Sequence, residues 1–192
     1  MNVMPRGVLH ALAWATLLVM GGIGAWSVVV LQHRDLWHLL LGDRPVMSVL
    51  VVGPVLGLAT AWGAWWIISR PRLDNVRYTY SEMIGPWMAR WTDRWFLSFC
   101  AGVGEELLFR GALQHWSGVP LTAFIFVAVH GYLDPRKLPL FIYGLYMTGA
   151  MMVFGLVAEA GGLLAPMIAH TLVDVVLLRR LRAEYAGRGS TP

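Results

Sequence analysis

Long apolar stretches are the feature that most constrains how this chain can fold. A transmembrane α-helix needs about 20 apolar residues, and stretches of that order recur along the whole sequence. They cover residues 8–31, 46–69, 95–116, 118–133, 137–158 and 161–179. Hydrophobic residues make up 57% of the chain and charged residues 14%, whereas a soluble domain carries about 25% charged residues. We therefore predict an all-α, polytopic membrane helix bundle with about six transmembrane helices.

The first apolar stretch is interpreted as a membrane helix and not as a cleaved signal peptide. It follows Arg6 and runs from Val8 to Leu31. The apolar region of a signal peptide has only about 7–15 residues and ends at a small-residue cleavage site. We therefore expect the longer stretch found here to span the membrane and to remain in it.

Basic residues lie between the apolar stretches, which is typical of residues that set membrane topology. The chain has 15 Lys and Arg residues and an isoelectric point near 9.6. With six crossings, most of them share one side with the two termini, and the other side has only Arg34 and Arg44. The positive-inside rule then predicts that both termini are cytoplasmic. It also identifies the lipid bilayer as the partner of these residues, so we expect no nucleic acid to bind.

The segment 70–94 joins two predicted membrane helices and mixes arginines with aromatic residues. The aromatic residues are Tyr78, Tyr80, Trp87 and Trp91. Arginines beside aromatic rings suit a segment at the level of the lipid headgroups. Two interpretations stay open: a loop that sets topology and carries interfacial aromatic residues, or an amphipathic helix that gates the entry of a substrate.

Ionisable residues inside the apolar stretches are costly in a membrane, so each one is a candidate functional residue. They are Glu105, Glu106, Arg110, His130, His170 and Asp174. His115 and Glu159 lie near predicted helix ends, where they can reach water, and we expect them at the interface. The predicted helices place the two histidines, Glu105 and Asp174 in the cytoplasmic half of the bundle, so these side chains can converge on one site.

Helix geometry separates the roles of the two adjacent glutamates. Glu106 and Arg110 are four residues apart and stack on one helix face, in the order that favours an intrahelical pair. Glu105 is rotated by about 100° from Glu106 and has no local cation. We therefore predict that Glu106 and Arg110 form a structural ion pair. Glu105 is predicted to be a working carboxylate, suited to general acid–base catalysis.

Three motifs on successive predicted helices resemble those of a known family. "EELLFR" holds Glu105, Glu106 and Arg110 in an EExxxR pattern, "FVAVH" holds Phe126 and His130 in FxxxH, and "HTLVD" holds His170 and Asp174 in HxxxN/D. In this order they resemble the CPBP group, also called the Abi group. This group comprises CAAX prenyl proteases and bacteriocin-processing enzymes. The resemblance covers residues 105–174, and each motif by itself is weak.

The resemblance implies an intramembrane endopeptidase that cleaves a membrane-anchored protein or peptide. Glu105 and His130 would activate a water molecule, while His170 and Asp174 would stabilise the oxyanion. The supporting residues would be Glu106, Arg110 and Phe126. Because an ionised Asp174 cannot donate a hydrogen bond, it is either protonated or orients His170, and we favour orientation.

The chain is expected to form one integral membrane domain, residues 1–192. Residues 1–94 would contain two N-terminal helices and the basic amphipathic segment. Residues 95–180 would form a four-helix catalytic core, and residues 181–192 a cytoplasmic tail.

The cofactor expectation is that the enzyme works without metal. A glutamate with two histidines is also a zinc ligand set, but the HExxH pattern is missing and the three residues lie on separate predicted helices. We therefore favour a glutamate-type protease that holds no cofactor, with a zinc-dependent version of the same protease as the alternative.

Two other classes of function compete with the protease. A small proton-coupled transporter could use the same groups as a relay, although repeats and broken helices are missing. A non-catalytic scaffold or bacteriocin-immunity protein would tolerate the change Glu105→Gln. Arginine far outnumbers lysine, which suggests a GC-rich bacterial genome and the cytoplasmic membrane as the location. Leader peptides or sorting signals are then favoured over CAAX-type tails as substrates.

Overall fold

The computed structural model describes residues 5–188, and these residues form helices joined by short connections. The first long helix is built from α1 (Arg6–Ala15), the π-helical turn η1 (Thr16–Met20), α2 (Gly21–Trp26) and the π-helical turn η2 (Ser27–Leu31). There follow α3 (Leu36–Leu41), α4 (Val46–Ile68), η3 (Pro71–Leu73), α5 (Asp74–Ile84) and η4 (Gly85–Met88). The rest comprises α6 (Trp91–Glu106), the π-helical η5 (Leu107–Leu113), α7 (Gln114–Val129), α8 (Leu138–Gly161) and α9 (Leu164–Arg188). The all-α prediction is confirmed.

Four helices of the described part are long and apolar enough to cross a membrane. They are Arg6–Leu31, Val46–Ile68, Trp91–Val129 and Leu138–Gly161. The third comprises the two helices that were predicted at 95–116 and 118–133. Unbroken, its 39 residues would extend about 58 Å, well beyond a hydrocarbon core of about 30 Å. The helix breaks at Gly118, whose φ of 71° and ψ of 170° are not helical, so the chain turns at the start of the fourth predicted helix.

Several predicted boundaries differ from the structure. The fourth predicted helix ends at Val129 and not at residue 133, so His130 occupies its C-cap. The segment 70–94 is helical along most of its length, because α5 and two short 3₁₀ turns occupy it, so the helical one of the two open interpretations fits its backbone. The predicted tail is helical as far as Arg188, and residues 189–192 lie outside the described part.

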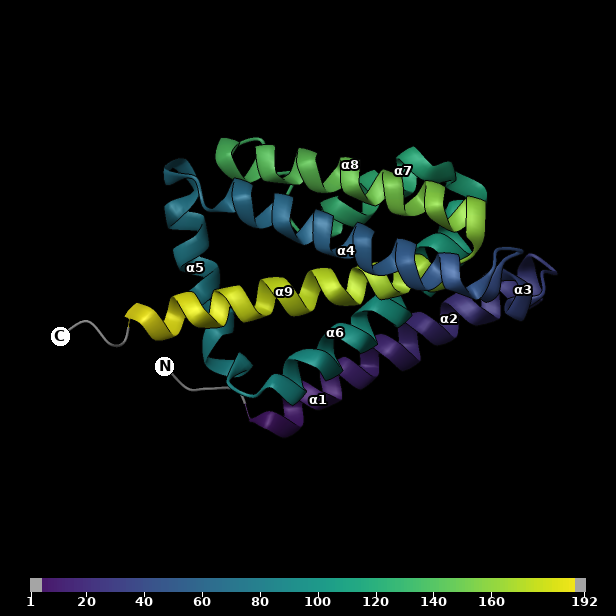
Figure 1. The fold of residues 1–192 in the computed structure, drawn as a ribbon, viewed down its shortest axis with the longest axis horizontal. Coiled ribbons are helices and arrows are strands. Elements are labelled where there is room, and N and C mark those ends of the chain that lie inside the picture. The colour runs from purple at the N-terminus through teal and green to yellow at the C-terminus, as the bar shows by residue number, and fades with distance from the viewer. Residues whose placement is uncertain (1–4, 189–192) are drawn as a thin grey trace.

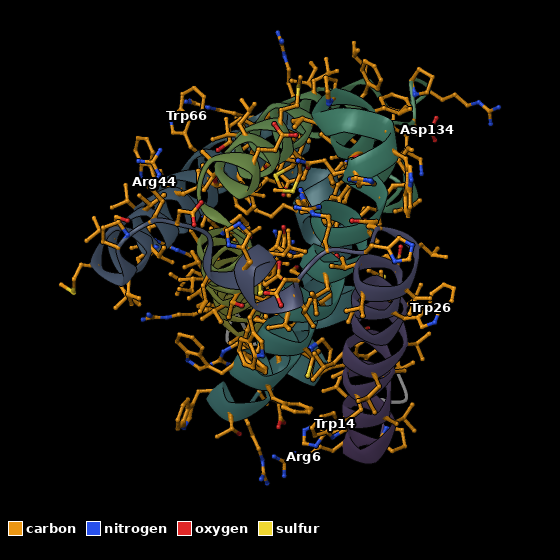
Figure 2. All side chains as sticks on the ribbon, turned by 90° about the vertical axis from the view of Figure 1, so that its right-hand side faces the viewer. Arg6, Trp14, Trp26, Arg44, Trp66 and Asp134 are labelled. Carbon is orange, nitrogen blue, oxygen red and sulfur yellow. The ribbon has the colours of Figure 1, made fainter. Side chains whose placement is uncertain are left out.

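The helices form an elongated bundle in which both ends of the described chain lie at the same end (Figure 1). The short helix α3 lies at the opposite end, and α5 runs from near the end of α4 across α9, which extends beyond it (Figure 1). Large apolar side chains cover the outside of the bundle. Figure 2 shows Trp14, Trp26 and Trp66 among them, and each is about half exposed. An apolar outer surface of this kind suits contact with lipid chains.

The first long helix packs closely against the helix that carries the paired glutamates. A Cβ atom on Gly24 would lie 2.5 Å from the backbone of Leu107, and one on Gly104 would lie 2.6 Å from the carbonyl oxygen of Thr16. Only glycine permits this distance between two helix backbones. At the end of the bundle that contains the termini, Asp93 is buried and accepts hydrogen bonds from Arg6 at 2.7 Å and from His10 at 2.9 Å.

Candidate active site

The two adjacent glutamates occupy the last turn of α6, immediately before the π-helical segment η5. Short π-helical segments occur often at functional sites. Gly102 brings this part of α6 against α9, because a Cβ atom there would contact the side chain of Thr171. The side chain of Glu106 is fully buried, and that of Glu105 is 14% exposed. The two carboxylates therefore leave the same turn into different surroundings.

Glu106 holds two partners with one carboxylate oxygen. Arg110 Nη1 donates to Glu106 Oε1 at 3.0 Å, so the predicted ion pair is present. His170 Nδ1, on α9, lies 2.9 Å from the same oxygen. The guanidinium of Arg110 is also 4.6 Å from the ring centre of Phe126, and its Nη2 donates to Met151 Sδ at 2.9 Å. Glu106 thus joins α6, η5 and α9 inside the bundle.

Glu105 faces both histidines but forms a hydrogen bond with neither of them. Its Oε2 atom lies 3.6 Å from His130 Nε2 and 3.9 Å from His170 Nε2. Both distances are too long for a direct hydrogen bond. Glu105 Oε2 is buried and has no hydrogen-bond partner within residues 5–188. A water molecule could hydrogen-bond to this oxygen and to a histidine nitrogen at the same time.

The partners of the other ring nitrogens determine the state of each histidine. His130 Nδ1 lies 2.6 Å from the carbonyl oxygen of Phe126, which can only accept, so Nδ1 carries the hydrogen. His170 Nδ1 likewise donates to the Glu106 carboxylate. In the neutral form of either ring, Nε2 then has a free lone pair. Both Nε2 atoms lie within 4 Å of Glu105 Oε2.

Asp174 lies beside His170 but forms no hydrogen bond with it. The distance from His170 Nε2 to Asp174 Oδ2 is 3.8 Å, which is beyond hydrogen-bond range. In this structure Glu106 holds the Nδ1 atom of His170, and the catalytic role of Asp174 stays a prediction. Asp174 follows His170 by one turn of the same helix, whereas Nδ1 of the ring points across to α6.

Phe126 is the contact shared by the cationic and imidazole groups. Its ring stacks on His130 with centroids 4.5 Å apart and meets the edge of His170 at 5.6 Å. The Arg110 guanidinium lies over the same ring. The phenylalanine of the FxxxH motif thereby packs against both histidines and Arg110.

Accessibility increases from Glu106 towards Asp174. The side chains of His130 and Asp174 are 33% and 31% exposed, while that of His170 is 8% exposed. Asp174 also lines a cavity of about 120 Å³ together with Tyr80 and Tyr132. This cavity extends between α4, α5, α8 and α9. A substrate or water molecule can therefore approach the site from the side of Asp174 and α5.

Tyrosines at this cavity were not among the residues predicted from sequence. Tyr132 stacks beside His130 with ring centroids 5.9 Å apart, and Tyr143 meets the edge of Tyr132 at 5.3 Å. Burial raises the pKa of the hydroxyl groups of Tyr80 and Tyr132, so both keep their protons at neutral pH. The only sequence signal for Tyr132 was its position, two residues after the histidine of the FxxxH motif. Tyr143 offered none.

The described part of the chain contains no cluster of side chains arranged to bind a metal ion. Within residues 5–188, no group of three or more His, Cys, Asp or Glu side chains is arranged to hold a metal ion. His130 and His170 both turn Nε2 to Glu105, but each lies more than 3.5 Å from its carboxylate oxygen. His115 and Glu159, which were expected at the interface, are both exposed in the structure.

Comparison with known proteins identifies relatives of the segment that carries the site. Residues 86–176 match the family described as "Rce1-like: Type II CAAX prenyl endopeptidase Rce1-like". The chain is 34% identical over 94 residues to the uncharacterized protein YpbD of Bacillus subtilis (strain 168). The aligned segment covers 48% of each protein. The chain thus spans about half the length of this curated relative. No solved structure matches the chain.

Proposed function

We propose that this chain is an intramembrane endopeptidase. The proposal starts from the match of residues 86–176 to the Rce1-like type II CAAX prenyl endopeptidase family. Membership in the family implies protease activity, and the substrate is then a protein. The observation that carries the proposal is the position of Glu105. Its buried carboxylate oxygen has two imidazole nitrogens, one from α7 and one from α9, within 4 Å.

Water is the proposed nucleophile, and Glu105 is the proposed general base. The carboxylate of Glu105 removes one proton from the water molecule while the water oxygen bonds to the peptide carbonyl carbon. His130 Nε2 accepts the second hydrogen bond of this water and orients it. When the C–N bond breaks, Glu105 returns the proton to the leaving nitrogen. Each proton and electron pair is thus accounted for within the site.

His170 is the proposed donor to the oxyanion. Since Nδ1–H is engaged with Glu106, Nε2 can donate only when the ring carries both protons. Three carboxylates, those of Glu105, Glu106 and Asp174, lie within 4 Å of this ring and supply counter-charge. Asp174 acts in this scheme as a counter-ion at the cavity mouth. Hydrogen-bond donation to the developing charge is a major source of catalysis in acyl transfer.

The proposed topology has six membrane crossings, with both termini in the cytoplasm of a bacterium. Two crossings are added to the four candidate spans when the helix of residues 91–129 is divided at Gly118 and α9 is included. The excess of basic residues at one end of the bundle supports this orientation. The candidate site then opens towards the cytoplasmic side through the cavity beside α5.

The proposed substrate is a membrane-anchored polypeptide, with leader peptides and sorting signals favoured over CAAX-type tails. The cavity that ends at Asp174 is lined mainly by apolar side chains and tyrosines, which suits an apolar segment. We propose that hydrolysis proceeds without a metal ion, and a zinc-dependent reaction is the alternative.

The decisive experiment compares Glu105→Gln with Glu159→Gln in the purified full-length protein. Both changes replace a carboxylate by an amide, but Glu159 is exposed, lies near the end of α8 and does not belong to the cluster of Glu105 with the two histidines. Cleavage of candidate membrane-anchored peptides is followed in detergent, with and without a chelator. We expect Glu105→Gln to lower the rate about 10²- to 10⁴-fold and Glu159→Gln to leave it unchanged. Equal rates for both variants would contradict the proposal. Loss of cleavage on chelation, with recovery on added zinc, would favour the zinc-dependent alternative.

A further inference from the structure

A groove between α4 and α9 lies outside the candidate active site. It has a volume of about 590 Å³ and opens on the outer surface of the bundle. One wall is apolar and comes from α4, where Leu58, Ala61, Trp62 and Trp65 share a helix face. The opposite wall comes from α9, where Val176 is followed by Arg179 and Arg180.

The groove arises because α4 and α9 are close at one end and apart at the other. A Cβ atom on Gly57 would lie 2.6 Å from the carbonyl oxygen of Ala169, so the two backbones meet at this level. Towards the end that contains the chain termini the two helices diverge (Figure 1). Trp65 of α4 and Arg180 of α9 line the groove in this part of the bundle. The shape is therefore built into the packing of the two helices.

Two guanidinium groups lie at the rim of this apolar groove. Arg179 and Arg180 are exposed, and within residues 5–188 neither forms an ion pair with a carboxylate. The Arg180 guanidinium lies 5.7 Å from the ring centre of Trp65. Nearby on the same end of α4, Arg70 stacks over Trp66 at 3.6 Å. Tryptophan and arginine together are the side chains that mark a membrane–water interface.

We propose that this groove is a binding site for an anionic phospholipid. One acyl chain would lie against Leu58, Trp62 and Trp65, and the phosphate would lie between Arg179 and Arg180. Unpaired arginines beside an apolar groove at the basic end of a membrane protein attract anionic headgroups. A zwitterionic lipid lacks the net charge that the two arginines select, and a soluble anion lacks the chain that the groove accepts.

The proposed lipid site and the cavity beside the candidate active site share one lining side chain. Trp65 lines both the groove and the cavity that ends at Asp174. A lipid chain in the groove therefore contacts the side chain of Trp65, which also lines the cavity. The inference requires that the chain lie in a bilayer, and it does not require that the chain cleave peptides.

The test measures lipid binding by native mass spectrometry of the full-length protein in detergent. Phosphatidylglycerol and phosphatidylcholine with identical acyl chains are titrated separately, and inorganic phosphate is added as a competitor. The groove variant is Arg179→Gln with Arg180→Gln. The matched control is Arg72→Gln with Arg90→Gln, which removes the same charge from exposed positions at the same end of the bundle. Ala183→Trp, at an exposed position that lines the groove, fills it without a change of charge.

We expect the groove variant to bind phosphatidylglycerol about tenfold more weakly, and the control variant to bind it as the unmodified protein does. Ala183→Trp is expected to weaken binding as well, and phosphate is expected not to displace the lipid. The inference is overturned if both double variants lose affinity equally, if phosphatidylcholine binds as tightly, or if phosphate displaces the lipid. Thermal unfolding of each variant shows whether a loss of binding comes from a loss of fold.

Discussion

A single carboxylate oxygen, Glu106 Oε1, connects the charged and imidazole groups of the candidate site. It receives hydrogen bonds from Arg110 at 3.0 Å and from His170 at 2.9 Å. The two roles are distinct, because one partner balances buried charge and the other sets the direction of an imidazole ring. Glu105, its neighbour, has neither role and is turned to the open side of the site. The EE pair therefore divides into one structural and one reactive residue.

Glu106→Gln is predicted to destabilise the protein and to reduce its activity. The change leaves the Arg110 guanidinium, whose side chain is 1% exposed, without its counter-charge. Breaking a buried ion pair costs about 3–5 kcal/mol. Thermal unfolding in detergent measures the effect, and Glu105→Gln serves as the control that keeps the pair. An unchanged unfolding temperature for Glu106→Gln would show that the pair contributes nothing to stability.

Asp174→Asn is predicted to keep activity within about tenfold of the unmodified protein. The orientation of His170 depends on Glu106, and the distance of 3.8 Å to Asp174 is too long for a hydrogen bond. An amide at this position can also donate to an oxyanion, whereas an ionised carboxylate cannot. The value of kcat/KM on one peptide measures the effect. A loss as large as that of Glu105→Gln would return Asp174 to a central catalytic role.

At the level of the elements, the first long helix packs against the segment that carries the two glutamates. It contacts α6 and η5 through Gly24 and Gly104, so it lies against the turn that carries the glutamates. Gln32, just beyond its end, donates to the carbonyl oxygens of Gly111 at 3.2 Å and Ala112 at 3.1 Å. These hydrogen bonds supply partners to the π-helical segment η5, whose backbone pattern differs from that of an α-helix.

Gly24→Val is predicted to destabilise the protein, while Gly22→Val leaves it nearly unchanged. A Cβ atom on Gly24 would meet backbone atoms of Leu107 at 2.5 Å, whereas a Cβ atom on Gly22 would meet nothing within 4 Å. Both changes add the same side chain to the same helix, so helix propensity cancels in the comparison. Overpacking costs about 1–3 kcal/mol. Thermal unfolding measures the difference, and equal effects would mean that the two helices can move apart freely.

Across the whole molecule, the two ends of the bundle differ in charge and in shape. One end contains both ends of the described chain, α5 and most of the arginines, and the other contains α3 (Figure 1). The candidate site lies between them and opens towards α5 through the cavity beside Asp174. The lipid groove opens at the same basic end. Access to the site and contact with anionic lipid are therefore expected on one membrane face.

The topology predicts that opposite ends of the bundle are labelled from opposite sides of the membrane. Single cysteines are introduced as Asp43→Cys, near α3, and Arg136→Cys, between α7 and α8, in a Cys100→Ala background. The natural cysteine, Cys100, is fully buried. We expect a membrane-impermeant thiol reagent to label position 43 in intact cells and position 136 only after the membrane is opened. The reverse pattern would invert the proposed orientation.

The sequence alone was sufficient for those features that depend on composition and on spacing within one helix. Apolar length predicts the helical class, and the i, i+4 spacing predicts the Glu106–Arg110 pair, because both are set within a single segment. The three motifs also identify which side chains meet at the site.

Only the tertiary structure decided the relations between helices. It assigned the orientation of His170 to Glu106 and not to Asp174, and it placed Tyr132 and Tyr143 beside the site. It also decided between the two interpretations of the basic segment 70–94, because α5 is helical and borders the cavity. The physical reason is that hydrogen bonds and ring contacts across helices depend on helix rotation and separation. These are set by close contacts such as that of Gly24 with Leu107, which no spacing within one helix encodes.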